Sequence, residues 1–154
     1  MSRIIVDTSF LVGLMDDKDR RRAQILRIPE VLEQAKWEIV LFDCVFNEVI
    51  SVLAKRLEEK RRSSELPALM DKVERFAKEQ GIQWLYPDLP DKIWDVFDSV
   101  GHYKGSLSFH DALIALAAKE TSLQYIVSFD RDFDEVKWLI RVEDEKDLVK
   151  VEPP

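Results

Sequence analysis

The chain has one cysteine, Cys44, among its 154 residues, and this scarcity excludes two ways of stabilising a small fold. A single thiol forms no internal disulfide bond and cannot supply the ligand set of a cysteine-based zinc site. Four glycines leave little room for phosphate-binding loops, and neither G-x-x-x-x-G-K-[ST] nor G-x-G-x-x-G occurs. No apolar run approaches the roughly 20 residues of a membrane-spanning helix. The first strand begins almost at the N-terminus, so we expect no signal peptide and a cytoplasmic protein.

The composition is ordinary for a globular protein, but the charge is unevenly distributed. Hydrophobic residues make up 46% of the chain and charged residues 34%, as in a soluble domain that buries roughly two-thirds of its unfolded surface. The net charge of −7 argues against a protein that simply coats nucleic acid. Basic residues are nevertheless concentrated in 18–27 and 55–62. Such clusters either bind a phosphate backbone or form solvated helix faces.

Short apolar runs alternate with helical periodicity along the chain. The runs predict buried strands over 4–6, 38–42, 82–86 and 125–129 and an edge strand over 138–142. Helices are predicted over 10–15, 18–36 (with a break at Ile28-Pro29), 43–62, 63–80, 88–103 and 109–122. This alternation predicts one α/β domain over 1–154, with a three-layer α/β/α architecture around a central, mainly parallel sheet of four to five strands. Residues 143–154 are charged and form a tail or a short closing segment.

The first strand ends abruptly on Asp7-Thr8-Ser9. Ligands of open α/β sheets bind beside the C-terminal ends of the strands, so Asp7 is expected at the mouth of the crevice. The alternative is that one of these three residues only caps the helix that follows.

Two further acids interrupt apolar helix faces. Glu48 lies within about 60° of Val45, Val49 and Val52 on a helical projection, so we expect its carboxylate to face the sheet and to need a cation or a proton. A buried salt bridge, or a helix rotated so that Glu48 lies at its edge, is the alternative. Asp111 is expected to point inward near a strand end, although Ser108 three residues earlier also predicts a capping box.

Asp130 and Asp132 follow the fourth predicted strand as Asp7 follows the first. Either could reach the same sheet edge, and a solvent-exposed turn is the alternative for at least one of them. Repulsion among converging acids would raise their pKa values unless a divalent cation compensates. An all-oxygen cluster selects a hard ion, Mg²⁺ or Mn²⁺, which is the usual apparatus of phosphoryl chemistry.

Together, these segments resemble the four acidic motifs of PIN-domain ribonucleases, whose largest prokaryotic group is the toxins of VapBC toxin–antitoxin pairs. The matching segments are Asp7-Thr8-Ser9, Asn47-Glu48-Val49, Phe109-His110-Asp111-Ala112 and Ser128-Phe129-Asp130-Arg131-Asp132-Phe133. The resemblance covers about residues 3–135, in the order and on the elements that the family requires. It implies the PIN fold.

The resemblance also implies an activity and partners. A PIN-like protein would be a Mg²⁺- or Mn²⁺-dependent endoribonuclease acting on RNA, usually homodimeric and often inhibited by an antitoxin. Its acids carry over as Asp7, Glu48, Asp111 and Asp130, of which Asp7, Asp111 and Asp130 would hold metal, with Ser9 in a supporting role. Asp132 could replace or assist Asp130. The main alternative is an inactive PIN-like module that binds an antitoxin or RNA, and the two histidines are interpreted as surface or packing residues.

Overall fold

In the described part of the chain, five short strands form the centre of the molecule, and all of them run parallel in the order β3-β2-β1-β4-β5. The computed structural model describes residues 2–151. The strands are β1 (Arg3–Val6), β2 (Glu38–Phe42), β3 (Ile82–Gln83), β4 (Tyr125–Val127) and β5 (Ile140–Val142). The register places Ile4 beside Ile39 and Val6 beside Val127.

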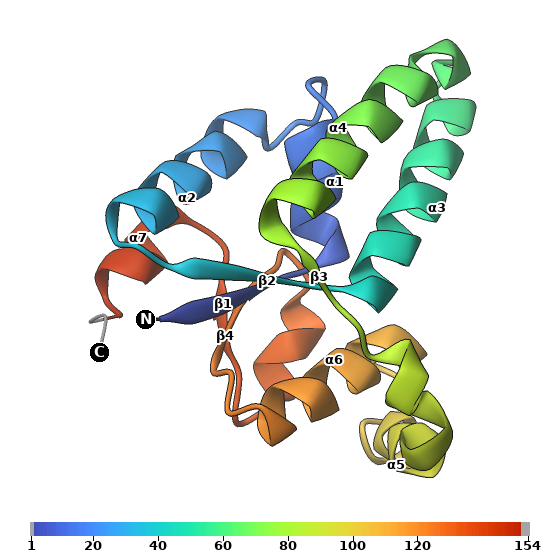
Figure 1. Cartoon of the computed structure of the whole chain (residues 1–154), viewed down its shortest axis with the longest axis vertical. Coiled ribbons are helices and arrows are strands. Elements are labelled where there is room, and N and C mark those ends of the chain that lie inside the picture. Colours follow the sequence, from blue (N-terminus) through green and yellow to red (C-terminus); the bar gives the residue numbers. More distant parts are fainter. Residues whose placement is uncertain (1, 152–154) are drawn as a thin grey trace.

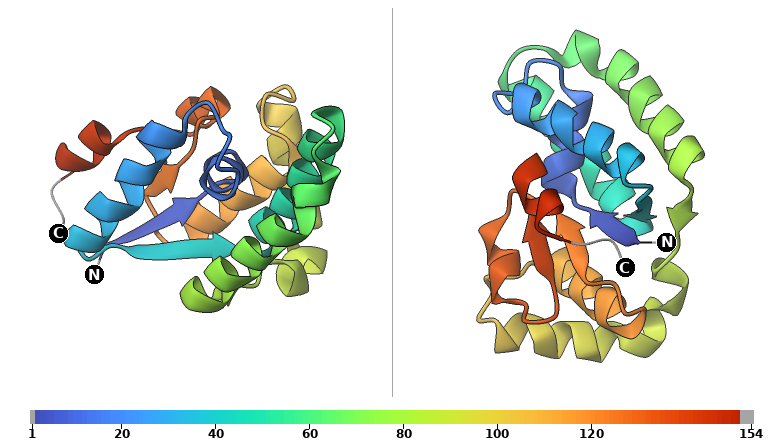
Figure 2. Two further views of the ribbon diagram at one scale, coloured as in Figure 1. Left: turned by 90° about the horizontal axis from the view of Figure 1, so that it is seen from above. Right: turned by 90° about the vertical axis from the view of Figure 1, so that its left-hand side faces the viewer.

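Within residues 2–151, seven helices surround this sheet. They are α1 (Thr8–Met15), α2 (Arg22–Gln34), α3 (Asp43–Glu59), α4 (Leu66–Gln80), α5 (Leu89–His102), α6 (Phe109–Glu120) and α7 (Glu145–Val149). Helices α1 to α4 lie on one side of the sheet and α5 and α6 on the other, which is the predicted three-layer α/β/α arrangement (Figures 1 and 2). Among residues 2–151, no helix combines the length and the apolar character that crossing a bilayer requires.

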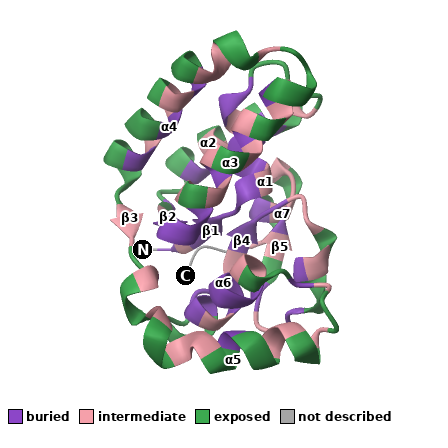
Figure 3. Cartoon of the chain, turned by 90° about the vertical axis from the view of Figure 1, so that its right-hand side faces the viewer, coloured by how far each residue is buried: buried purple, intermediate pink, exposed green. Residues whose placement is uncertain are grey.

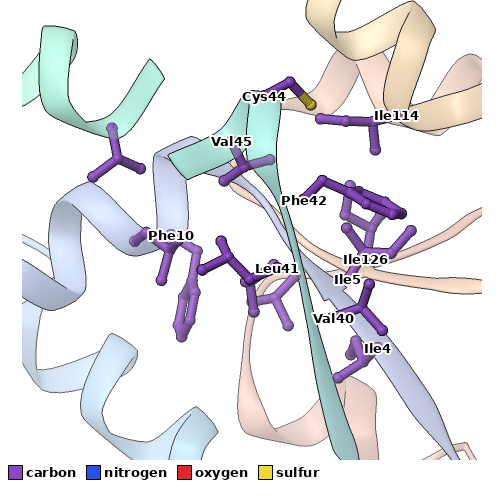
Figure 4. Packing of buried hydrophobic residues seen from close by; sticks show 14 of the residues in the cluster. Ile4, Ile5, Phe10, Val40, Leu41, Phe42, Cys44, Val45, Ile114 and Ile126 are labelled. Carbon is purple, nitrogen blue, oxygen red and sulfur yellow. The ribbon is translucent and has the colours of Figure 1, made fainter. Parts of the chain in front are cut away.

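The central strand β1 is short but buried, because both faces of the sheet are covered there. Ile4, Ile5 and Val6 are fully buried, as expected for a central parallel strand (Figure 3). Phe10 from α1 and Phe42 from β2 pack into the same core (Figure 4). A sheet filled from both sides in this way holds the ends of its strands in fixed positions.

The predicted break at Ile28-Pro29 is wrong, because α2 continues through Pro29 to Gln34. Buried Ile25, Ile28 and Leu32 attach one side of this helix to the core, and this packing outweighs the backbone hydrogen bond that proline cannot make. The start of the predicted helix is also wrong. Residues 18–21 form a turn instead, held by the carboxylates of Asp16 and Asp19.

Several predicted elements are shorter in the structure. The strand predicted over 82–86 ends at Gln83, because the backbone N–H groups of Leu85 and Tyr86 donate to the buried Asp43 carboxylate instead of to a neighbouring strand. Helix α3 ends at Glu59, and β4 ends at Val127. The predicted edge strand is confirmed as β5.

The segment after β5 closes the fold rather than trailing away. Asp144 and Asp147 form a capping box at the start of α7, and this helix packs against α2. Residues 152–154 of the predicted tail lie outside the described part of the chain.

The connections define where a ligand can bind. From β1 the chain proceeds outward to β2 and β3, then crosses back to β4 on the opposite side of β1. A crevice is expected where the strand order reverses, between the C-terminal ends of β1 and β4. Asp7 follows β1 and Ser128 follows β4 at this point.

Candidate functional site

A pocket of about 360 Å³ opens at the point where the strand order reverses. Four of the predicted acids line it: Asp7, Glu48, Asp111 and Asp130. They come from four separate segments: after the ends of β1 and β4, in the second turn of α3 and in the first turn of α6. The fold therefore brings these acids to a single cavity, as the positions of the strand ends predict.

Asp7 is the most buried of the four acids, with 4% of its surface exposed. It occupies the N-cap position of α1, yet its side chain makes no capping hydrogen bond. Instead, the hydroxyls of Ser9 and Ser128 both donate to Oδ2, at 3.0 and 2.7 Å. These bonds orient the carboxylate toward the pocket, so the alternative of a simple helix cap does not hold for Asp7.

Burial raises the pKa of Asp7 from 3.8 to about 6. Desolvation is the main cause, and the negative charge of Asp111 raises the pKa further. The hydrogen bonds from the two serines act in the opposite direction, because they stabilise the ionised form. Repulsion among the acids, the cause that the sequence suggested, does raise this pKa, but its effect is smaller than that of burial. A carboxylate in this state favours a nearby positive charge.

Glu48 lies at the rim of the pocket rather than under the apolar face of α3. Its side chain is 34% exposed, so the predicted burial against the sheet is wrong. The helix is rotated so that Val45 and Val49 are buried and Glu48 lies at the edge of the apolar face. Thr8 Oγ1 donates to Glu48 Oε2 at 2.8 Å, which holds the carboxylate beside the pocket.

His110 extends the surroundings of Glu48. Its Nδ1 lies 3.9 Å from Glu48 Oε2, and its Nε2 lies 3.3 Å from the Tyr86 hydroxyl. Asn47 also donates to that hydroxyl, at 3.3 Å. His110 therefore contacts two groups at the rim, although its position in the sequence suggested only a surface or packing role.

Asp111 has both of the roles that its sequence context suggested. Ser108 and Asp111 form a complete capping box, with Ser108 N–H donating to Asp111 Oδ2 at 3.0 Å. The residue is only partly buried, and it also lines the pocket. The capping box fixes the rotamer of Asp111 while one carboxylate oxygen accepts from the backbone.

Asp130 and Asp132 are distinguished by their positions. Asp130 lines the pocket, and its Oδ1 accepts from Asp132 N–H at 2.9 Å to cap the short 3₁₀ helix over 131–135. Asp132 is not among the residues that line this cavity. The charge of Asp130 raises the pKa of Asp132. Asp130 is thus the better placed of the two for a role in the pocket.

Four residues outside the predicted acid set also shape the pocket, two of them (Arg21 and Arg56) from the predicted basic clusters. Ser128 is fully buried and makes the shortest bond to Asp7, and its position directly after a buried strand was an available signal. Arg21, Arg56 and Asp19 form a charged wall on the side of α3. Their arrangement depends on the turn over 16–21, which no periodicity revealed.

The donor set fits a hard divalent cation. Asp7, Asp111 and Asp130 offer carboxylate oxygens, and both described bonds to Asp7 end on Oδ2. Within residues 2–151, no three side chains of the His, Cys, Asp and Glu types are grouped closely enough to enclose an ion on their own. Mg²⁺ is usually held by one or two carboxylates together with water and substrate phosphates, so this open arrangement is compatible with it.

Comparison with known proteins extends these observations. A family model of the PIN domain matches residues 4–139, whereas a search of curated proteins found no match. Among solved structures, that of Mycobacterium tuberculosis VapC20, described as a toxin that cleaves the sarcin–ricin loop, is similar with a TM-score of 0.67. The two chains are 23% identical over 90% of this chain and 98% of VapC20, and at this identity the likeness shows the fold alone. Because the family model spans most of the sequence, the chain belongs to the PIN domain family.

Proposed function

We propose that this protein is an endoribonuclease that cleaves RNA phosphodiester bonds with the help of Mg²⁺ or Mn²⁺. One observation carries the proposal: Asp7, Glu48, Asp111 and Asp130 line the same pocket beside the ends of β1 and β4. Membership of the PIN domain family supports the same reaction class. Converging carboxylates with no cysteine ligands are suited to phosphoryl chemistry rather than to redox or thiol chemistry.

Asp7, Asp111 and Asp130 are the proposed metal ligands, with Asp132 as a supporting residue near Asp130. A bound divalent cation would neutralise charge on the phosphodiester and lower the pKa of a water molecule. The chain itself prepares the site. Ser9 and Ser128 hold the Asp7 carboxylate by hydrogen bonds to Oδ2, so little reorientation is needed when the cation binds.

Glu48 is the proposed general base. Its side chain is partly exposed at the rim and is oriented by the Thr8 hydroxyl, so it can accept a proton from a water molecule that enters from solvent. A carboxylate that is accessible and fixed by one hydrogen bond is better placed for this role than the deeply buried Asp7.

The test is cleavage of 5′-labelled RNA, both a single strand and a stem–loop, by purified protein with Mg²⁺, Mn²⁺ or EDTA. We expect cleavage with either metal and none with EDTA, and loss of at least 100-fold in rate for Asp7→Asn and Glu48→Gln. A Ser99→Ala variant, changed in α5 outside the pocket lining, serves as the matched control. Wild-type rates in the Asp7→Asn protein would contradict the assignment.

Thermal stability provides a second readout that does not depend on finding the right RNA. Mg²⁺ or Mn²⁺ should raise the melting temperature of the wild-type protein, because an ion that binds only the folded state stabilises it by mass action. The increase should be smaller for Asp7→Asn. If the protein neither binds metal nor cleaves RNA, it is instead an inactive PIN-like module that binds an antitoxin or RNA.

We further propose that the protein is a cytoplasmic, homodimeric toxin of a toxin–antitoxin pair. The family resemblance and the VapC-like fold support this role. Induced expression should arrest growth, and co-expression of a small DNA-binding protein encoded directly upstream should restore it. Light scattering after size-exclusion chromatography tests the dimer. Unimpaired growth at high expression of active wild-type protein would contradict the toxin role.

A further inference from the structure

A second pocket, of about 640 Å³, lies beside the acidic one and has the opposite charge. The basic residues that line it outnumber the two acids, Asp19 and Glu59, by four, although the whole chain has a net charge of −7. We call this surface the basic groove. Its basic side chains are Lys18, Arg20, Arg21, Lys55, Arg56 and Lys60.

The basic groove and the acidic pocket share a wall. Asp19, Arg21, Val52 and Arg56 line both cavities. A ligand in one cavity therefore borders directly on the other, without crossing a ridge of unrelated residues. The two predicted basic clusters, 18–27 and 55–62, supply the opposite sides of this one groove.

Not all of the basic side chains are available to a ligand. Arg56 pairs with Asp19 at 2.7 Å, and Lys18 pairs with Glu65 at 2.7 Å. By contrast, no ion pair within residues 2–151 involves Arg20, Arg21, Lys55 or Lys60. Within the described part of the chain, no salt bridge ties up these four positive charges.

Arg21 is the link between the two cavities. Its guanidinium lies 4.8 Å from the centre of the ring of Phe129, the residue that precedes Asp130 in the sequence. Stacking on an aromatic face positions an arginine while leaving its N–H groups free for a planar or tetrahedral anion. Arg21 is therefore directed to the junction, where a phosphate adjacent to the scissile bond would lie.

We propose that the basic groove binds the sugar–phosphate backbone of the RNA substrate on one side of the cleavage point. This inference rests on the proposed nuclease function and adds where the strand leaves the site. Along α3, Glu48 and Lys60 are twelve residues apart, or about 18 Å at 1.5 Å per residue. This length corresponds to about five nucleotides at the 3.4 Å rise per residue of a stacked strand.

RNA fits the groove better than an acidic protein segment does. Both are polyanions, and both would satisfy Lys55 and Lys60. The difference is the pocket that shares a wall with the groove. An RNA strand in the groove continues into the proposed nuclease site, where a phosphodiester is the group on which the acids and a divalent cation would act.

The test compares two double variants that each remove two positive charges. Lys55→Gln with Lys60→Gln removes two of the unpaired positive charges of the groove, and Arg75→Gln with Lys137→Gln removes the charges of two exposed residues that line neither cavity. Glutamine is chosen because its helix propensity is close to that of lysine and arginine. Binding of a fluorescein-labelled 12-nucleotide single-stranded RNA is measured by anisotropy in EDTA, from 0.05 to 0.3 M KCl.

The groove variant should bind about 25-fold more weakly at 0.1 M salt, and its plot of log K against log salt should flatten by about 1.4. Both values follow from losing two phosphate contacts, each contributing about 0.7 to that slope for a single strand. The control variant should match the wild type. Equal affinity and slope in the groove variant would overturn the proposal.

Two further results separate this inference from its foundations. Because binding is measured without metal, weaker RNA binding by the groove variant supports the proposal about the groove even if no cleavage is found. Conversely, if the protein cleaves RNA but the groove variant binds it as the wild type does, only the proposal about the groove is overturned. A polyglutamate peptide is titrated in parallel. If Lys55 and Lys60 are needed for binding the peptide but not for binding RNA, the groove accepts an acidic protein segment and the proposal is wrong.

Discussion

Replacing Asp7 by asparagine should make the protein more stable while removing its proposed catalytic function. The folded state holds a proton on Asp7 more tightly than the unfolded chain, since burial raises its pKa from 3.8 to about 6. Stability associated with Asp7 is therefore fully present below pH 3.8 and is lost as the pH rises through 6. Above that pH, the folded protein contains a buried negative charge that asparagine would not carry.

The magnitude follows from the same two pKa values. At about 1.4 kcal/mol per pH unit, the difference between 3.8 and about 6 corresponds to about 3 kcal/mol at pH 8. The substitution preserves the two hydrogen bonds from serine hydroxyls, although the Thr8 N–H that also stabilises the Asp7 carboxylate loses part of its acceptor. Ser9 and Ser128 both donate to Oδ2, so the asparagine carbonyl can take that position and direct its amino group toward the neighbouring acids. We therefore expect Asp7→Asn to gain 2–3 kcal/mol at pH 8.

The assay is urea-induced unfolding in EDTA at pH 4.5, 6 and 8, followed by tryptophan fluorescence. Asp43→Asn is a matched control, because Asp43 is also buried but uses both oxygens: Oδ1 accepts from Cys44 N–H, and Oδ2 accepts from Leu85 and Tyr86 N–H. Asparagine there turns an amino group toward a backbone donor, so this variant should lose about 1–3 kcal/mol. Two outcomes would refute the reasoning: no gain for Asp7→Asn at pH 8, or a gain that does not change with pH.

Three other measurements probe the scaffold. Asp16 is fully buried and pairs with Arg62 at 2.8 Å, which holds its pKa at about 2. This stability is present above pH 3.8 and is lost as the pH falls through 2. Asp16→Asn should therefore cost about 2 kcal/mol at pH 7 and roughly a third as much at pH 2.5, checked by urea unfolding at both values. Pro29→Ala should stabilise the protein by about 1–3 kcal/mol in the same assay, since alanine restores a backbone donor inside α2; a loss would mean that the proline ring packs favourably. Trp94 and Phe97 are 71% and 66% exposed. Changing both to serine should therefore alter the free energy of unfolding by no more than about 0.5 kcal/mol per site. A larger loss that depends on protein concentration would instead place the two side chains in an interface.

The sheet could be predicted from the sequence because its signals are local. Ile4-Ile5-Val6 and Ile39-Val40-Leu41 read as doubly buried strands, and they are paired in the structure. The errors occur where one side chain changes the course of the backbone. Asp43 takes the N–H groups that would have extended β3, and its role as an acceptor depends on a loop more than 40 residues away.

The sequence predicted which acids line the pocket, but it did not predict how deeply each of them is buried. Strand ends must lie along one edge of a parallel sheet, so Asp7 and Asp130 were expected together. The position of Glu48 depends on the rotation of α3 about its axis, and the valines around Glu48 allow it to be either central or at the edge. Packing of α1 and α4 against α3 decides between these two rotations, and that packing is a tertiary property.

An acidic protein can still bind a polyanion if its charges are arranged locally. At physiological salt, exposed charges more than about 8 Å apart are largely screened from each other. RNA in the basic groove is therefore affected mainly by Arg20, Arg21, Lys55 and Lys60, and little by the exposed acids of α5 on the opposite face of the sheet. The acids near enough to repel it are Asp19 and Glu59 in the groove itself and the carboxylates of the acidic pocket. A divalent cation in the pocket would offset the repulsion from the pocket carboxylates. The net charge of −7 then limits non-specific binding, and the groove and the cation together select the strand that is cleaved.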